Sequence, residues 1–84
     1  MKVNKITLED AIDIVLDWAD SWGLDLEEMS YDYGAGEIAY YIANGHPQVR
    51  GARDLQNRLR SQDYDVNFNW DDMSFYVWDY HNRK

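Results

Sequence analysis

The chain has 84 residues, of which 45% are hydrophobic and 15% aromatic, and this composition suits one small folded domain rather than a disordered tail. Sixteen acidic residues against eight basic ones give a formal net charge of −8. The lack of cysteine excludes a disulfide, a thiol nucleophile and a cysteine-based zinc site. Because no apolar run reaches the roughly 18–20 residues of a membrane span and the N-terminus does not resemble a signal peptide, we expect a cytoplasmic protein.

Charged residues are segregated along the chain. Residues 6–49 contain ten acidic residues and no Lys or Arg, whereas residues 50–60 hold four arginines against one acid, Asp54. Residues 61–82 again carry five acidic residues and no Lys or Arg. Long acidic stretches around one basic segment predict distinct electrostatic faces on the folded protein.

The first predicted element is an amphipathic helix from about Leu8 to Trp22. Thr7 supplies an N-cap side chain, acidic residues occupy the first turn, and Gly23 is a typical helix stop. At about 100° per residue, the apolar side chains gather on one broad side: Leu8, Ala11, Ile12, Val15, Leu16, Trp18, Ala19 and Trp22. The acidic side chains fall within an arc of roughly 100° on the other side: Glu9, Asp10, Asp13, Asp17 and Asp20.

Three further segments have the pattern of strands. Residues 29–33 alternate before the glycine-rich turn at 34–36, which predicts a short strand. Near the C-terminus, the alternation in Tyr64–Trp70 and the following segment Met73–Tyr80 predict a tight antiparallel hairpin. Asp71-Asp72 would form the tip of this hairpin.

The segment 37–44 fits two structures. Ile38 and Ile42 have helical spacing with Tyr41, and they have strand spacing with Tyr40. A preceding glycine-rich turn suits a hairpin, which would continue the strand at 29–33. The sequence therefore leaves both a helix and a strand open at this segment.

A second helix is predicted from Pro47 to about Arg60, since proline suits the first helical turn. Gly51 inside this helix costs roughly 1 kcal/mol of helix propensity. One side of the helix is lined by Val49, Ala52, Leu55, Gln56 and Leu59. An adjacent side carries Arg50, Arg53, Asn57 and Arg60.

These elements predict a single small α+β domain over residues 1–84, with two or three helices packed on a small antiparallel sheet. Two weak internal similarities support two helix–strand–strand halves. Residues 21–26 resemble residues 61–66, and residues 29–31 resemble residues 73–75, at offsets of 40 and 44. The order of elements is either αββαββ or, with a helix at 37–44, the α-β-α-α-β-β order of a winged-helix domain.

The sequence offers little for catalysis, so we expect a protein that is not an enzyme and that needs no cofactor or metal. His46 and His81 are the only histidines, and neither has a Ser or Cys arranged beside it as a nucleophile. Asp71-Asp72 lacks the spaced oxygen ligands and the glycine of a calcium loop. The glycine-rich turn at 34–36 lacks the lysine of a phosphate-binding loop.

The acidic side of the first helix predicts a binding surface. Its carboxylates recur every three or four residues, and four residues advance a helix by about 6 Å, which approximates the spacing of phosphates along a nucleic-acid strand. We interpret this face as a mimic of a nucleic-acid backbone that blocks a basic partner, such as a nucleic-acid-binding protein or a nuclease complex. The candidate residues are Glu9, Asp10, Asp13, Asp17 and Asp20, with Asp71 and Asp72 of the hairpin. In general character, the protein resembles the small acidic inhibitors that phages use against restriction or CRISPR nucleases.

A helix at 37–44, a turn and the helix at 47–60 would instead form a helix-turn-helix with a hairpin after it. This order is similar to winged helix-turn-helix domains over the chain from residue 8. The resemblance implies a DNA-binding transcriptional regulator whose helix at 47–60 enters the major groove. The residues facing DNA would be Gln48, Arg50, Arg53, Asn57 and Arg60. The acidic hairpin tip and the net charge oppose DNA binding, so this is the second hypothesis.

Tyrosines provide a third candidate surface. The chain has seven, more than a core of this size is expected to hold. We expect exposed tyrosines such as Tyr31, Tyr33, Tyr40 and Tyr41 to anchor a partner protein or a symmetric homodimer.

Overall fold

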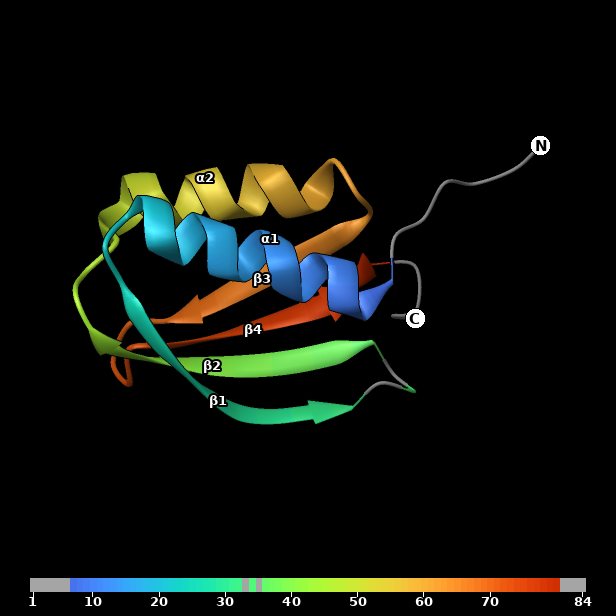
Figure 1. The fold of residues 1–84 in the computed structure, drawn as a ribbon, viewed down its shortest axis with the longest axis horizontal. Helices are drawn as coiled ribbons and strands as arrows, with labels where there is room; N and C mark the ends of the chain where they lie inside the picture. Colours follow the sequence, from blue (N-terminus) through green and yellow to red (C-terminus); the bar gives the residue numbers. More distant parts are fainter. Residues whose placement is uncertain (1–6, 33, 35, 81–84) are drawn as a thin grey trace.

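Two helices lie on one face of a four-stranded antiparallel sheet in the computed structural model, which describes residues 7–32, 34 and 36–80 (Figure 1). The elements in chain order are α1 (Leu8–Ser21), β1 (Asp25–Asp32), β2 (Glu37–Asn44), α2 (Gln48–Arg60), β3 (Tyr64–Asn69) and β4 (Ser74–Asp79). The strand order in the sheet is β1-β2-β4-β3, and each neighbouring pair is antiparallel. The predicted α+β fold is therefore confirmed, in its αββαββ form.

Residues 37–44 form strand β2, so the winged-helix interpretation of the topology is wrong. Ile38, Tyr40 and Ile42 are buried at alternate positions, as strand spacing requires. Gly36 has a backbone φ of 70°, which a glycine adopts readily in the turn between β1 and β2. Because the element directly before α2 is a strand, α2 cannot form a helix-turn-helix with it.

The two halves of the chain repeat the order helix, strand, strand. Strands β2 and β4, the last strand of each half, pair at the centre of the sheet. The similarity at an offset of 40 matches equivalent places, because residues 21–26 connect α1 to β1 and residues 61–66 connect α2 to β3. The similarity at an offset of 44 is wrong as a repeat, since it aligns β1 with β4.

The ends of α1 agree with the sequence analysis. The Thr7 hydroxyl accepts a hydrogen bond from the Asp10 backbone N–H at 3.2 Å, and the Asp10 carboxylate accepts one from the Thr7 backbone N–H at 3.5 Å. This capping box satisfies two N–H groups that the helix leaves unpaired.

Neither helix in the described part of the chain is long and apolar enough to cross a membrane.

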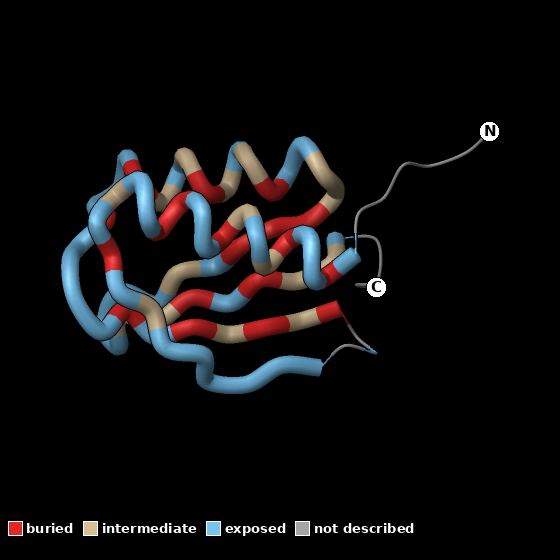
Figure 2. The backbone as a smooth tube through the Cα atoms, viewed as in Figure 1, coloured by how far each residue is buried: buried red, intermediate tan, exposed pale blue. Residues whose placement is uncertain are grey.

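The hydrophobic core lies between the helices and the inner face of the sheet (Figure 2). Trp18 is fully buried and packs edge-on against Phe75, with ring centroids 5.7 Å apart. Burial on each helix is narrower than the sequence predicts. Leu16 is 48% exposed and Val49 is 62% exposed, because each lies more than about 100° around its helix from the centre of the buried stripe.

Gly51 allows the two helices to approach closely. The Trp18 indole Nε1 donates a 2.8 Å hydrogen bond to the Gly51 carbonyl oxygen across the helix pair. A Cβ atom at position 51 would lie 2.8 Å from the Pro47 Cβ and 3.3 Å from ring atoms of Trp22. The glycine that weakens helix propensity in the sequence therefore makes room for the partner helix.

We predict that Gly51→Ala destabilises the protein by about 1–3 kcal/mol, although alanine is the better helix former. The added methyl group would meet both Pro47 and Trp22, and the 2.8 Å contact with the rigid Pro47 ring requires a shift. Urea unfolding followed by circular dichroism measures the effect. Asn57→Ala, at an exposed position of the same helix, is the control and should be neutral or stabilising by a few tenths of a kcal/mol. Stabilisation by Gly51→Ala equal to that of the control would contradict the packing argument.

A candidate protein-interaction surface

The segregation of charge along the sequence coincides with the two structural halves. Residues 7–45, with α1, β1 and β2, hold ten acidic residues and no Lys or Arg, and we call this the acidic half. Residues 46–80, with α2, β3 and β4, hold six acidic residues and four arginines, a formal charge of −2. Nine of the ten carboxylates of the acidic half are exposed, and Glu37 is half-buried. One side of the domain therefore has a strong negative field that no nearby basic residue of its own half reduces.

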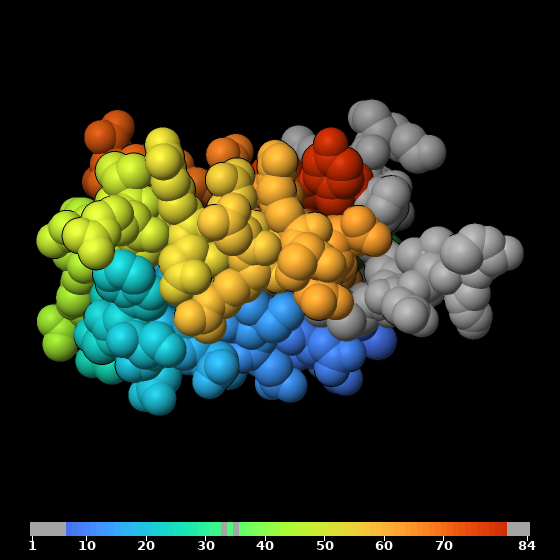
Figure 3. Space-filling view, turned by 90° about the horizontal axis from the view of Figure 1, so that it is seen from above, coloured from blue at the N-terminus to red at the C-terminus, as the bar shows by residue number. Residues whose placement is uncertain are grey.

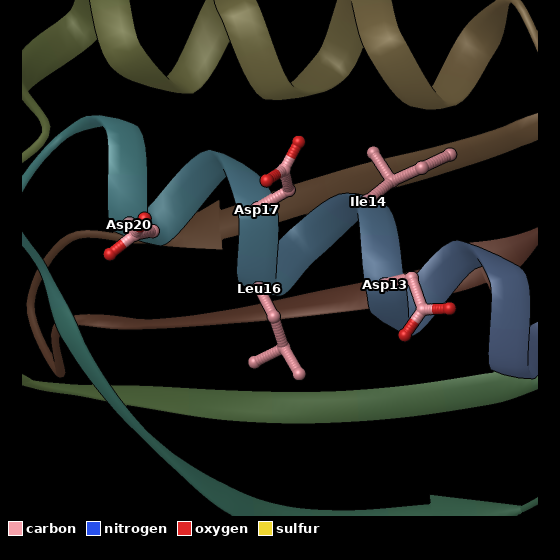
Figure 4. A pocket seen from close by; sticks show the side chains of 5 residues that line it. All are labelled: Asp13, Ile14, Leu16, Asp17 and Asp20. Carbon is pink, nitrogen blue, oxygen red and sulfur yellow. The ribbon is translucent and has the colours of Figure 1, made fainter.

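The acidic residues predicted on α1 are brought together on one exposed face. Asp13, Asp17 and Asp20 line an open depression of about 550 Å³ with the side chains of Leu16 and Ile14 (Figure 4). Among residues 7–32, 34 and 36–80, these three aspartates form no ion pair. Glu9 and Asp10 are also exposed, in the first turn of the helix. The face thus presents exposed carboxylates, with the exposed Leu16 on the side of Asp13 and Asp20 (Figure 4).

The structure does not bring the hairpin acids to this face. Asp71 and Asp72 lie in the turn between β3 and β4, and α2 lies between this turn and α1 in the view of Figure 3. The Asp71 backbone N–H donates a 3.2 Å hydrogen bond to Asn69 Oδ1, and Asp72 Oδ2 accepts one of 3.1 Å from Asn69 Nδ2. The Asn69 side chain thus ties both residues into their own turn, away from α1, so we exclude them from the candidate surface.

Two of the four arginines of α2 are occupied by acids of the same half. Arg58 forms an ion pair of 3.2 Å with Asp54, and Arg60 forms one of 3.0 Å with Asp65. The other members of the predicted DNA-facing set are exposed on α2: Gln48, Arg50, Arg53 and Asn57. Within the described part of the chain, only two exposed arginines have no ion pair, which is a small basic surface.

The Asp65 carboxylate is the most buried charge that the structure describes. Burial raises its pKa, but hydrogen bonds from Arg60, the Val66 backbone N–H and Gln56 outweigh burial and hold the pKa below its usual value. The donor–acceptor distances are 3.0, 2.8 and 3.2 Å, respectively. Because Arg60 and Gln56 extend from α2, this carboxylate attaches the helix to the edge strand β3.

A similar arrangement links the two halves at Asp54. A 2.9 Å hydrogen bond from the Trp22 indole N–H lowers the pKa of Asp54; desolvation opposes this effect and Arg58 adds to it. The carboxylate thus accepts a donor from α1 and pairs with the base one turn further along α2.

The exposure predicted for the tyrosines is confirmed in part, and their role as anchors stays a prediction. Tyr31 is 57% exposed and Tyr41 is 41% exposed, but Tyr40 is buried against Phe75, so its prediction as an exposed anchor is wrong. Tyr33 lies outside the described residues. Tyr76, which was not among the tyrosines predicted to be exposed, is 39% exposed on β4. In a strand, the apolar neighbours Phe75 and Val77 indicate that Tyr76 points to the opposite, exposed face, so its exposure could have been predicted from the sequence.

Metal sites and the two histidines were the remaining features to locate in the described residues. Among them, no group of three or more His, Asp or Glu side chains lies close enough to hold a metal ion. The exposed His46 ring stacks on Trp70, and its Nδ1 accepts a 2.9 Å hydrogen bond from the Gln48 backbone N–H. His81 lies outside the described residues. Comparisons with protein-family models, curated proteins and solved structures found no match to this chain.

We predict that Asp65→Asn lowers the free energy of unfolding by about 1–3 kcal/mol at pH 7. Since the pKa of Asp65 is lower in the folded than in the unfolded protein, its ionised form stabilises the fold above about pH 4, and this contribution is lost as the pH falls further. The gap between wild type and variant should therefore narrow below pH 4.

Urea unfolding at several pH values between 7 and 3 tests this dependence. Asp71→Asn removes the same charge from an exposed turn and should change stability by less than about 0.5 kcal/mol. A gap between wild type and Asp65→Asn that stays constant over this pH range would contradict the assignment.

Proposed function

We propose that this protein is a non-enzymatic acidic binding protein whose acidic half occupies the basic, nucleic-acid-binding surface of a partner protein and blocks it. The observation that carries the proposal is that the stretch of sequence with ten acidic residues and no Lys or Arg, residues 7–45, folds as one helix–strand–strand unit, α1, β1 and β2. A surface that serves solubility alone usually intersperses both signs of charge.

The geometry of α1 supports mimicry of a phosphate backbone. Asp13, Asp17 and Asp20 follow one another at helical spacing, and four residues advance the helix by about 6 Å. All three are exposed and are not neutralised by any ion pair in the described residues. A groove that binds nucleic acid through Lys and Arg would meet a comparable row of negative charges here.

Electrostatic attraction between such surfaces sets the expected behaviour of the complex. Oppositely charged faces raise the association rate, and salt screens exposed charges within about 8–10 Å at physiological ionic strength. We therefore expect fast, salt-sensitive binding to a nuclease of the restriction or RNA-guided class. The protein would act as a competitor of DNA, without cleaving or modifying it.

We predict that the protein displaces labelled duplex DNA from such a nuclease in a fluorescence anisotropy competition, and that Asp13→Asn with Asp17→Asn weakens the competition about tenfold, or about 1.4 kcal/mol. The matched control is Asp71→Asn with Asp72→Asn. It changes the net charge equally but lies in the β3–β4 turn, on the other side of α2.

The assay uses one restriction endonuclease and one RNA-guided nuclease, each without magnesium so that the DNA stays intact. The control should retain competition to within about threefold of wild type, which is about 0.7 kcal/mol. Equal losses in the two double variants would show that net charge alone matters. No displacement of DNA from either nuclease would reject the proposed partner class.

A further inference from the structure

The sheet has an outer face, opposite the helices, that exposes aromatic rings. Strand alternation directs Tyr40 and Phe75 to the core and their neighbours Tyr41 and Tyr76 to the outer face. Trp78 follows on the same side of β4, and its ring centroid lies 6.2 Å from that of Tyr76. Three aromatic side chains from β2 and β4 therefore form a group at the centre of the outer face.

The strand register places carboxylates beside these rings. Glu27 of β1 pairs with Tyr41, and Glu37 of β2 pairs with Trp78. The Tyr76 hydroxyl donates a 2.9 Å hydrogen bond to Glu37 Oε1. Because paired residues of antiparallel strands point to the same face, each ring has a carboxylate as a direct neighbour.

The small side chain of Ala39 leaves a shallow depression at the centre of the outer face. Ala39 pairs with Tyr76 across β2 and β4 and with Ser30 across β1 and β2. A depression of about 90 Å³ lies here, with Glu37 and Asp32 in its lining. Its size suits one side-chain group rather than a whole small-molecule ligand.

Rings with adjacent carboxylates match the chemistry of arginine. A guanidinium group stacks on an aromatic face and donates forked hydrogen bonds to a carboxylate, whereas a lysine ammonium is a compact point charge that stacks less well. Tyrosine and tryptophan are also the residue types that most often contribute large binding energies at protein interfaces.

We propose that the outer sheet face binds arginine side chains of the basic partner, which stack on Tyr41 and Tyr76 and pair with Glu27 and Glu37. This inference rests on the proposed function, because it assigns a second surface of the acidic half to the same partner. It adds a selectivity that the acids of α1 do not provide, namely arginine over lysine at equal charge.

Charge decides between the possible occupants of this face. A second copy of the chain would place its own Glu27, Asp32 and Glu37 against the same three carboxylates, and like charges repel. A nucleic acid would meet the same repulsion through its phosphates. A basic protein segment is the occupant that both the rings and the carboxylates attract.

The test compares fluorescein-labelled nona-arginine and nona-lysine peptides by anisotropy at about 50 mM salt, where electrostatic binding is strong. The ratio of the two dissociation constants is the measured quantity. Wild type should bind nona-arginine about three- to tenfold more tightly. Tyr41→Thr with Tyr76→Thr changes no charge and keeps residues that favour strands, and it should reduce this preference to about one.

Two outcomes overturn the inference: a wild-type protein without preference, or a double variant that keeps the wild-type preference. Circular dichroism first establishes that the double variant folds. Where it does not fold, the two single variants replace it, each expected to lower the preference at least twofold, and an unchanged preference in both overturns the inference.

The variant Asp13→Asn with Asp17→Asn separates this inference from the proposed function. It should weaken binding of both peptides equally and leave the arginine preference intact. If it changes neither affinity, the role proposed for α1 fails, while a preference that depends on the tyrosines still supports the outer face.

Discussion

The close contact between α1 and α2 at Gly51 is the constraint on which the surfaces of this protein depend. The Trp18 indole donates to the Gly51 carbonyl oxygen, and Trp22 packs where any larger residue would need space. This contact holds both helices on one face of the sheet, over a core centred on Trp18 and Phe75. With both helices on one side, no helix of the described residues covers the opposite face, and the outer side of α1 turns away from the core.

The core must offset the repulsion among the ten carboxylates of the acidic half, because closely spaced like charges destabilise a compact fold. Within the described residues, the two arginines of α2 that form ion pairs use acids of their own half. Arg60 pairs with Asp65 and fixes α2 to β3, whereas Arg58 pairs with Asp54 one turn away within α2 itself. The excess of acidic residues in one half is therefore a property of the fold, and it would attract a basic partner.

Local sequence signals were sufficient to predict most helices and strands, whereas the remaining features depend on long-range packing. The capping box at Thr7 and the alternation of β3 and β4 are local, and both elements were predicted. The segment 37–44 was ambiguous because eight residues fit either period. Its strand form depends on distant partners, such as the pairing of Tyr40 with Phe75. Exposure of Leu16 on the acidic surface was missed because the width of the buried stripe depends on how closely the helices pack.

Hydrogen exchange of the protein, measured by mass spectrometry with and without an excess of a DNA-free restriction endonuclease, tests whether the acidic half is the binding surface. We expect binding to slow exchange in peptides covering α1, β1 and β2, while peptides from α2 and the β3–β4 turn exchange as in the free protein. Protection centred on α2, around Arg50 and Arg53, would show instead that the partner binds the basic side of the domain, and it would rule out the acidic half as the binding surface.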